Sequence, residues 1–331
     1  MTAWALHYDL RAPEIGAPPP VLYRAALEQS AWAEGHGVGA IVVSEHHGQD
    51  DGYLPSPLTM AAALAARTER AFLSVNALVL TLHDPVAIAE QALVVDNLSG
   101  GRLVLTLVPG YVPSEFAMFG VDHAARASVF EAKVAALTSA LTGEPFDWLG
   151  RTVRVTPAPV QRPRPMVLVG GGSKAAARRA ARLGDGFGPT VPDEALVQAY
   201  RDECQRLGKE PGIVARHHGP LTVHVADDPE SAWATIGPHV LHELRSYGRM
   251  AAEAGERHPY ARLADMVEAR AAGVVAVVTP EECVALAQSL PPDDVVVIKP
   301  LIGGLDPDVA WSSLELFATK VLPALHHRNR G

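Results

Sequence analysis

The chain has 331 residues, of which 48% are hydrophobic and 20% are charged, and its formal net charge is -9 at pH 7. This length is normal for one (β/α)8 barrel of roughly 250 residues with added insertions, and the composition provides for a large buried core. The acidic balance argues against a nucleic-acid-binding protein, which would need a clustered basic face.

The two cysteines, Cys204 and Cys283, lie far apart in helix-like stretches. They indicate neither a disulfide framework nor a thiolate metal site. The first residues, MTAWALHYDLRAPE, lack the basic start and apolar core of an export signal, and no apolar run reaches the length of a membrane span. We therefore expect a cytoplasmic protein that has no membrane partner.

Short β-rich runs alternate with helical patterns along the chain. The clearest runs are residues 4–10, 40–44, 72–80, 103–108, 166–169, 221–225 and 295–298, and a weaker run at 186–190 brings the number to eight. Several runs are continuously apolar, such as AIVV and VVVI. Such runs are typical of parallel strands that are buried on both faces.

Three predicted helices begin with a capping side chain and a proline, at Asp84-Pro85, Thr279-Pro280 and Asp306-Pro307. The capping oxygen accepts a free backbone N–H, and proline suits the first helical position. The helix that begins at residue 85 should end at Gly100, just before the next strand. The repeated order of strand, cap, helix and glycine predicts an α/β fold, with a single (β/α)8 TIM-type barrel domain over residues 1–331.

Two stretches interrupt this order. Residues 142–164 form a loop-like connection with four prolines, and residues 237–273 separate the last two predicted strands. We interpret both as insertion loops at the C-terminal face of the barrel, where such loops shape the substrate pocket. Residues 247–260 are a candidate lid.

The helix predicted over residues 85–99 is apolar over more of its surface than packing on a barrel requires. Val86, Ala89 and Leu93 share one face, whereas a second apolar face carries Ile88, Ala92 and Val95. A second buried partner is therefore expected, and we favour a homodimer interface. The alternative is an insertion of the same chain that covers the helix.

A glycine run follows the strand at residues 166–169. Gly170, Gly171 and Gly172 let backbone N–H groups crowd an anion, Ser173 offers a hydroxyl group, and Lys174 adds a cation at the start of a helix. We interpret this run as the phosphate-binding loop of a cofactor site. The alternative is a tight turn in which the serine only caps the helix. The run is neither a Walker motif nor a GxGxxG fingerprint.

The tetrapeptide SEHH, at residues 44–47, follows the second predicted strand at the end where barrel active sites lie. A histidine there can transfer protons near neutral pH, so His46 is the catalytic candidate. We interpret His47 as structural. Successive side chains on a strand point to opposite sides, so this pair does not indicate a metal site.

Four segments of the chain carry a family resemblance. They are SEHH at 44–47, VNALVLTLHDPVAIAEQALVVDNLSGGRL at 75–103, GGGSKAAARRAARLGDG at 170–186 and GVVAVVTPEECVALAQSL at 273–290. In this order they resemble the bacterial luciferase-like flavin-dependent monooxygenase and oxidoreductase family over nearly the whole chain. The resemblance implies a TIM-type barrel that binds reduced FMN, or alternatively the deazaflavin F420, at its C-terminal mouth.

The resemblance also implies functions for particular positions. The non-proline cis peptide that supports the flavin ring in this family falls at Asn76-Ala77. The phosphate loop falls at Gly172, Ser173 and Ala176. The histidine that handles protons corresponds to His46.

Two positions depart from the family pattern. Pro109 stands where luciferase-type members have a phosphate-binding arginine, which removes a bidentate partner. Ala176 lacks the hydroxyl group that some members have. The loop would therefore hold a phosphate through its backbone donors, Ser173 and Lys174.

The function that the resemblance implies is that of an enzyme, a flavin-dependent monooxygenase. Reduced FMN from a separate flavin reductase would react with O2 and oxygenate a small organic substrate. The alternatives are an F420-dependent hydride-transfer oxidoreductase and a non-catalytic flavin-binding barrel subunit. Four residues near strand ends are predicted to line the substrate pocket: His7, Tyr8, His83 and Tyr111. No metal is expected, because the first strand carries no His-x-His pair.

Overall fold

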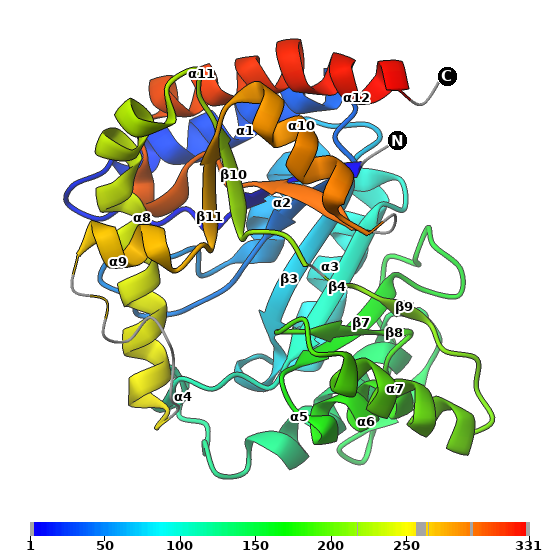
Figure 1. Ribbon diagram of the computed structural model, residues 1–331. Coiled ribbons are helices and arrows are strands. Elements are labelled where there is room, and N and C mark those ends of the chain that lie inside the picture. Colours follow the sequence, from blue (N-terminus) through cyan, green and yellow to red (C-terminus); the bar gives the residue numbers. More distant parts are fainter. Residues whose placement is uncertain (1–2, 217, 256–262, 264, 292–293, 329–331) are drawn as a thin grey trace. The chain divides into compact units, whose positions relative to one another are not determined.

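The computed structural model describes residues 3–216, 218–255, 263, 265–291 and 294–328 (Figure 1). The chain forms two compact units. Unit 1 takes its described residues from Met1–Val42, His47–Pro55 and His218–Gly331, and unit 2 from Val43–His46 and Ser56–His217.

Unit 1 contains two groups of parallel strands. Strand β1 (Ala3–Tyr8) pairs with β12 (Val295–Ile298), and its other neighbour is β2 (Ala40–Val43). Strands β10 (Thr222–Val225) and β11 (Val275–Val278) form a second parallel pair. The helices of this unit are α1 (Pro19–Gly35), α8 (Pro229–Glu253), α9 (Met266–Ala271), α10 (Pro280–Ser289), α11 (Pro307–Leu316) and α12 (Leu322–Arg328), with the short turns η3 (Ile302–Gly304) and η4 (Phe317–Val321).

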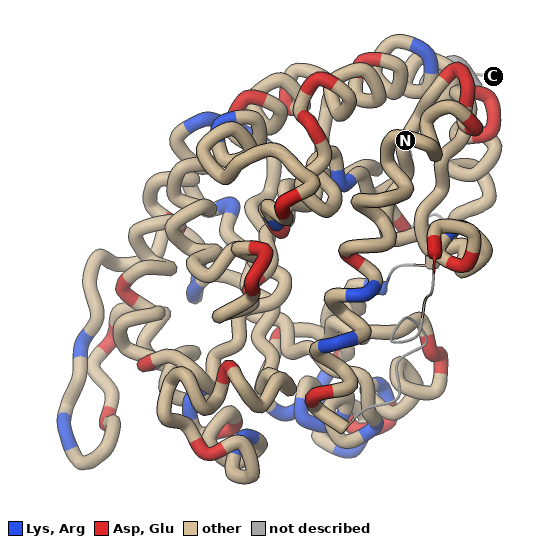
Figure 2. Tube along the Cα trace, turned by 90° about the vertical axis from the view of Figure 1, so that its left-hand side faces the viewer, with Lys and Arg blue, Asp and Glu red and all other residues tan. Residues whose placement is uncertain are grey.

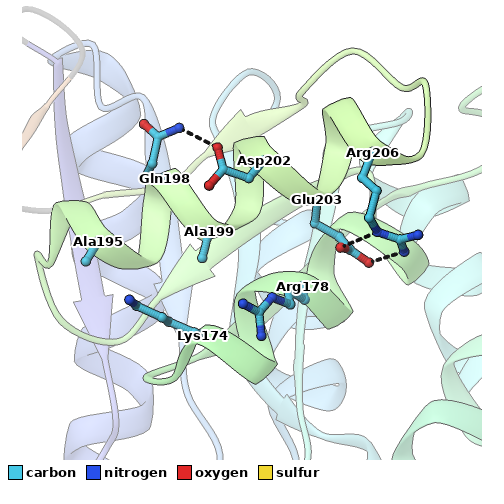
Figure 3. Close-up of a pocket in the computed structure, with 8 residues that line it drawn as sticks. All are labelled: Lys174, Arg178, Ala195, Gln198, Ala199, Asp202, Glu203 and Arg206. Atoms are coloured by element: carbon cyan, nitrogen blue, oxygen red, sulfur yellow. Dashed lines mark hydrogen bonds and ion pairs between the residues drawn. The ribbon is translucent and has the colours of Figure 1, made fainter.

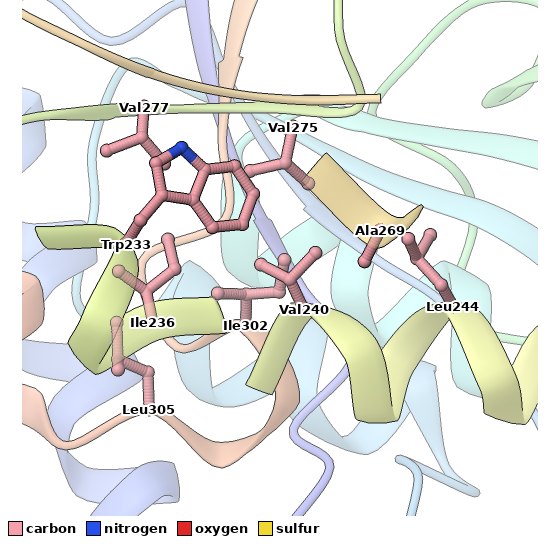
Figure 4. Close-up of a cluster of buried hydrophobic side chains, with 9 residues drawn as sticks. All are labelled: Trp233, Ile236, Val240, Leu244, Ala269, Val275, Val277, Ile302 and Leu305. Atoms are coloured by element: carbon pink, nitrogen blue, oxygen red, sulfur yellow. The ribbon is translucent and has the colours of Figure 1, made fainter. Parts of the chain in front are cut away.

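The core of unit 1 forms where one face of α8 packs against β11 (Figure 4). Trp233, Ile236, Val240 and Leu244 are spaced three or four residues apart, so they lie on one side of the helix. Buried valines from β11 and an alanine from α9 join the cluster, and Ile302 of η3 and Leu305 just after it complete it. This packing holds α8 against the strands of the unit.

Unit 2 contains five parallel strands in the order β3 (Phe72–Val79), β4 (Leu103–Val108), β7 (Met166–Gly171), β8 (Gly186–Pro189) and β9 (Ile213–Val214). Its helices are α2 (Pro57–Ala65), α3 (Pro85–Ser99), α4 (Pro113–Phe119), α5 (Arg126–Ala140), α6 (Lys174–Leu183) and α7 (Glu194–Arg206), with the turn η1 (Leu80–Leu82). An antiparallel hairpin, β5 (Phe146–Trp148) and β6 (Arg151–Val153), lies within the proline-rich stretch 142–164.

Helix α3 begins and ends where the sequence predicts. The side chain of Asp84 accepts hydrogen bonds from the N–H groups of Val86 and Ala87, and Gly100 adopts a left-handed conformation with φ 66°. The second apolar face, with Ile88, Ala92 and Val95, is buried. Because α3 packs against both α2 and α5, that burial partner comes from the same unit.

Strands alternate with helices in both units, which confirms the predicted α/β class. The strands at 103–108 and 295–298 have the predicted bounds. Four strands were not expected, β5, β6, β9 and β11, and each has at most four residues. The stretch 237–273 begins inside the continuous helix α8, and residues 256–260 of the candidate lid lie outside the described residues.

Acidic and basic residues are interspersed along the trace (Figure 2). Acidic residues outnumber basic ones, which gives the net charge of -9. Within the described part of the chain, no helix is both long enough and apolar enough to span a bilayer.

Candidate functional site

His46 forms a buried pair with Glu115 in unit 2. Its Nδ1 atom lies 2.7 Å from Oε1 of the carboxylate. The histidine is 8% exposed and the glutamate 1% exposed, so water competes little for this bond. A carboxylate at Nδ1 favours the tautomer with its proton on that nitrogen, which leaves Nε2 as the proton-accepting atom.

No sequence pattern indicates this partner of His46. Glu115 is 69 residues further along the chain, and it occupies the first turn of α4, two residues after Pro113. An acidic residue there is typical of any helix N-terminus. Its burial is the feature that distinguishes it, and burial comes from the fold.

Glu45 binds two other residues of the candidate site, Val79 and His83. Its Oε2 accepts the backbone N–H of Val79 at 2.6 Å, and its Oε1 meets Nε2 of His83. The ring of His83 also lies edge-on to Phe119, with 5.9 Å between the ring centroids. The predicted pocket residue His83 is therefore held in place by a buried carboxylate at the end of β3.

The peptide bond between Asn76 and Ala77 is cis, as the family resemblance implied. The pairing of β3 with β4 is irregular at the same place, between Asn76 and Leu78. Asn76 is exposed and Ala77 is half-buried. A planar ring can therefore reach this strand.

The glycine run forms the turn from β7 into α6. Ser173 is the N-cap of α6, and its Oγ accepts the N–H of Ala176 at 3.2 Å. A Cβ atom on Gly171 would lie 2.5 Å from the Cβ of Ala176, and one on Gly172 would lie 2.7 Å from Oγ1 of Thr190. Close packing of the turn thus requires glycine whether or not an anion binds.

The same turn suits a phosphate group. Residues 172–175 are exposed, and the N–H groups of Lys174 and Ala175 precede the first helical hydrogen bond, from Ala177 to Ser173. The capping oxygen of Ser173 accepts a bond, while its hydroxyl hydrogen can still point to an anion. These donors and the helix N-terminus fit a phosphate monoester. They do so although position 109 is a proline and offers no arginine side chain.

The other predicted pocket residues have different environments. Tyr111 lies edge-on to the ring of His46 at 5.8 Å, in unit 2. In unit 1, Tyr8 is buried, and its hydroxyl donates to Oε1 of Gln29 at 3.2 Å. Burial raises the pKa of Tyr8 well above its usual value. Tyr8 thus has the environment of a core residue, whereas the neighbouring His7 is half-buried.

Unit 1 holds a buried charged cluster that the sequence analysis missed. We define it as Asp9, Arg11, Asp51, Glu243 and Lys299. Nη1 of the arginine lies 2.5 Å from Asp51, and Nζ of the lysine lies 2.9 Å from Asp9 and also contacts Glu243. Each member is at most 6% exposed.

Two tyrosines enclose the arginine of this cluster. The guanidinium carbon of Arg11 lies 4.4 Å from the ring centroid of Tyr53 and 4.8 Å from that of Tyr247. Burial alone would raise the pKa of Asp9, but the neighbouring lysine and arginine hold it well below its usual range. Burial raises the pKa of Glu243.

The family assignment follows from sequence comparison. A family model described as luciferase-like monooxygenase matches residues 7–289. The chain therefore belongs to the luciferase-like monooxygenase family.

Two curated relatives use different cofactors. The FMNH2-dependent dimethylsulfone monooxygenase of Pseudomonas putida is 29% identical over 234 residues, covering 65% of this chain and 60% of that protein. The F420-dependent glucose-6-phosphate dehydrogenase of Nakamurella multipartita is 28% identical over 218 residues, covering 58% of this chain and 64% of that protein. Both matches span less than two thirds of the relative's own length.

A solved structure is similar over the whole chain. The monooxygenase RslO1 from Streptomyces bottropensis matches with a TM-score of 0.79 at 24% identity, covering 97% of this chain and 99% of that one. This likeness establishes a shared fold.

Proposed function

We propose that the protein is a flavin-dependent monooxygenase that uses reduced FMN and O2 on a small organic substrate. The observation that carries the proposal is the exposed turn at Gly172–Lys174, whose donors fit a phosphate, in the same unit as the cis peptide of β3 and the buried pair of His46 and Glu115. The FMNH2-dependent relative supports this choice of cofactor.

Each part of unit 2 then has a task. Ser173, Lys174 and the first N–H groups of α6 bind the phosphate, and the peptide at Asn76-Ala77 supports the ring. When bound, the reduced flavin supplies the reaction with dioxygen. His46 transfers a proton through Nε2 while Glu115 holds the ring, and His83 and Tyr111 line the substrate pocket.

The proposal extends to the assembly and the setting of the enzyme. We propose one (β/α)8 barrel domain with insertion loops at its C-terminal face, a homodimer, a cytoplasmic location, and a separate reductase that delivers the reduced flavin. The RslO1 structure, which matches 97% of the chain, supports the single domain. The acidic net charge supports a small-molecule substrate over nucleic acid.

A second candidate is hydride transfer with reduced F420 and without oxygen. Pro109 favours it, because this residue has neither a charge nor an N–H with which to bind the phosphate of FMN, and the F420-dependent relative supports it. The paired His46 and Glu115 count against the third candidate, a non-catalytic subunit, since a lost site has no need of a buried proton-handling pair.

Anaerobic titration with reduced FMN and reduced F420, side by side, tests the proposal. We expect FMN to bind with a stoichiometry of about one per chain and its reoxidation by O2 to change when substrate candidates are added. Tight binding of F420 alone would favour hydride transfer. Binding of neither cofactor by folded protein would refute both.

A further inference from the structure

A groove of about 320 Å³ runs along helix α8 in unit 1. Its lining residues on the helix recur every three or four positions, and so do the core residues of α8 that Figure 4 shows. The two sets are out of phase, so the groove lies on a different side of the helix from the core. Its apolar wall consists of Ile15, Pro238, Leu241 and Met266.

Two large apolar side chains of this wall remain accessible. Ile15 is 56% exposed and lies in a turn that the N–H of Gly16 closes on the carbonyl oxygen of Pro13 at 2.8 Å. Met266, the first residue of α9, is 42% exposed. A Cβ atom on Gly237 would lie 2.9 Å from its Sδ atom, so the methionine packs directly over this glycine. The wall therefore offers apolar surface that an apolar ligand could cover.

The rest of the lining is basic. Nε2 of His242 lies 2.8 Å from Oδ2 of Asp51, and Nε of Arg245 donates to the carbonyl oxygen of Leu263 at 2.9 Å. Arg249 is exposed, and it forms no ion pair or hydrogen bond in the part of the chain that the structure describes. The two arginines are one helical turn apart, about 6 Å along the axis. They present two guanidinium groups along one side of α8.

A second groove, between α6 and α7 in unit 2, has a different charge pattern. Arg178 shares the lining of that groove with Asp202 and Glu203 (Figure 3). Among the described residues that line the groove of α8, in contrast, there is no aspartate or glutamate. The positive charge of the α8 groove is thus not balanced within its own lining, and an anion would complement it.

We propose that the groove of α8 binds a small carboxylate that has an apolar body. Arg245 and Arg249 bind the carboxylate group, whose planar shape fits a guanidinium fork. Ile15, Leu241 and Met266 contact the apolar body. The volume equals that of about ten water molecules at roughly 30 Å³ each, which suits a ligand of about ten non-hydrogen atoms.

Phenylacetate is the probe that we choose for this site. It has about the expected size, and its ring can contact the sulfur atom of Met266. The inference does not depend on the proposed function, because the residues proposed to bind the cofactor and to transfer a proton all belong to unit 2.

NMR titration of the full chain, labelled with ¹³C at its methionine methyl groups, tests the proposal. The chain has six methionines, and a Met266→Leu variant assigns the signal of interest. We expect phenylacetate to shift the Met266 signal and to leave that of Met118, in unit 2, unchanged. Phenylacetamide, which has the same shape without the charge, should bind about 10-fold more weakly, since it makes no charge-assisted contact. A shift at Met118 alone would place the ligand elsewhere and overturn the inference.

Arginine variants test the origin of the affinity. R249Q should weaken phenylacetate binding by about 5- to 10-fold and R245Q/R249Q by more, while the affinity for phenylacetamide stays constant. The matched control is R178Q, which removes an arginine from the groove that contains carboxylates and should change affinity by less than about 2-fold. Because Arg249 has no described partner to lose, R249Q tests the charge even if R245Q disturbs α8. Equal affinity for the acid and the amide, an unchanged dissociation constant in R249Q, or no Met266 shift in the folded wild type would each refute the site.

Discussion

Nδ1 of His46 and Oε1 of Glu115 lie 2.7 Å apart in a buried part of unit 2, although 69 residues separate them in the chain. The histidine is the third residue after β2, and the glutamate comes from the first turn of α4. Their contact joins the proposed proton-transfer residue to a carboxylate that favours the proton on Nδ1.

Glu115→Met should release this control. The methionine side chain has similar length but no acceptor for a hydrogen bond, so the Nδ1 proton of His46 loses its partner. We expect histidine ¹⁵N spectra to show Nδ1 protonated in the wild type and a shift towards Nε2 in the variant. The free energy of unfolding should fall by about 1–3 kcal/mol. The control is Glu131→Met, which removes an exposed partner of Arg179, and an unchanged tautomer in Glu115→Met would contradict the assigned pair.

Ser173→Ala should weaken FMN binding by about 5- to 10-fold, because one hydroxyl donor to the phosphate is lost. Riboflavin, which lacks the phosphate, should bind equally well to both proteins. The same change also removes the N-cap of α6, at a cost of about 1 kcal/mol.

Thr279→Ala separates these two effects of the serine substitution. Thr279 caps α10 within a capping box, so its loss costs a similar stability without touching the phosphate loop. An equal drop in FMN affinity in both variants would show that the serine acts only through helix stability.

Gly171→Ala should destabilise the turn into α6. The added Cβ would lie 2.5 Å from that of Ala176, which forces the strand and the helix apart, at a cost of about 1–3 kcal/mol. Gly35→Ala is the control, because a Cβ there has nothing within 4 Å. Urea denaturation of the two variants measures the difference, and equal stability would mean that the turn relaxes freely.

Lys299→Met should be strongly destabilising. It leaves Asp9 and Glu243 without their shared cation in a buried place, and removal of one partner of a buried pair costs about 3–5 kcal/mol. Lys320→Met removes an exposed lysine that pairs with Asp227, and should cost less than about 1 kcal/mol. Similar losses in the two variants would show that the buried cluster contributes no more than a surface pair.

Glu243 should make the free energy of unfolding depend on pH at values above 4.5, the ordinary pKa of a glutamate carboxyl group. Burial raises the pKa of this carboxyl group above the usual 4.5. Its contribution is then fully present below pH 4.5 and is lost as the pH rises through the folded pKa. Glu243→Gln should therefore gain stability relative to the wild type as the pH rises, measured by urea denaturation at several pH values. A constant difference between the two proteins would contradict the raised pKa.

Local patterns predicted the fold class and most strand positions because their causes are local. Runs such as LVLTLV and VVVI have the composition of buried parallel strands, and Asp84 and Gly100 mark the ends of α3 by their own side-chain and backbone chemistry. Strand β9, in contrast, has only two residues, Ile213 and Val214, which is too short for any periodicity to register. Strand β11 is recognised by its pairing with β10 more than 50 residues earlier.

The candidate site likewise has parts that the local sequence indicates and parts that arise only from the fold. The glycine run and the cis peptide fall inside contiguous motifs, so the sequence indicated where both would lie. The carboxylates of Glu115, Asp51 and Glu243 lie far apart in the chain, and each has the character of an ordinary surface residue until its burial and its basic partner identify it. Tyr8 is similar, because its position at a strand end predicted a pocket residue but did not indicate that its hydroxyl donates to Gln29 in a buried environment.

The contact of Glu45 with both Val79 and His83 limits how the pocket can be redesigned. His83 is a natural position to vary in a search for new substrates of the proposed pocket, because it directly follows η1 and its side chain is 20% exposed. Replacing it removes the imidazole that Oε1 of Glu45 meets, and Glu45 is bonded covalently to His46. A library that varies His83 alone would therefore report on the proposed proton-transfer residue, His46, as much as on substrate choice. Pairing each His83 variant with a compensating residue at position 45 would separate the two.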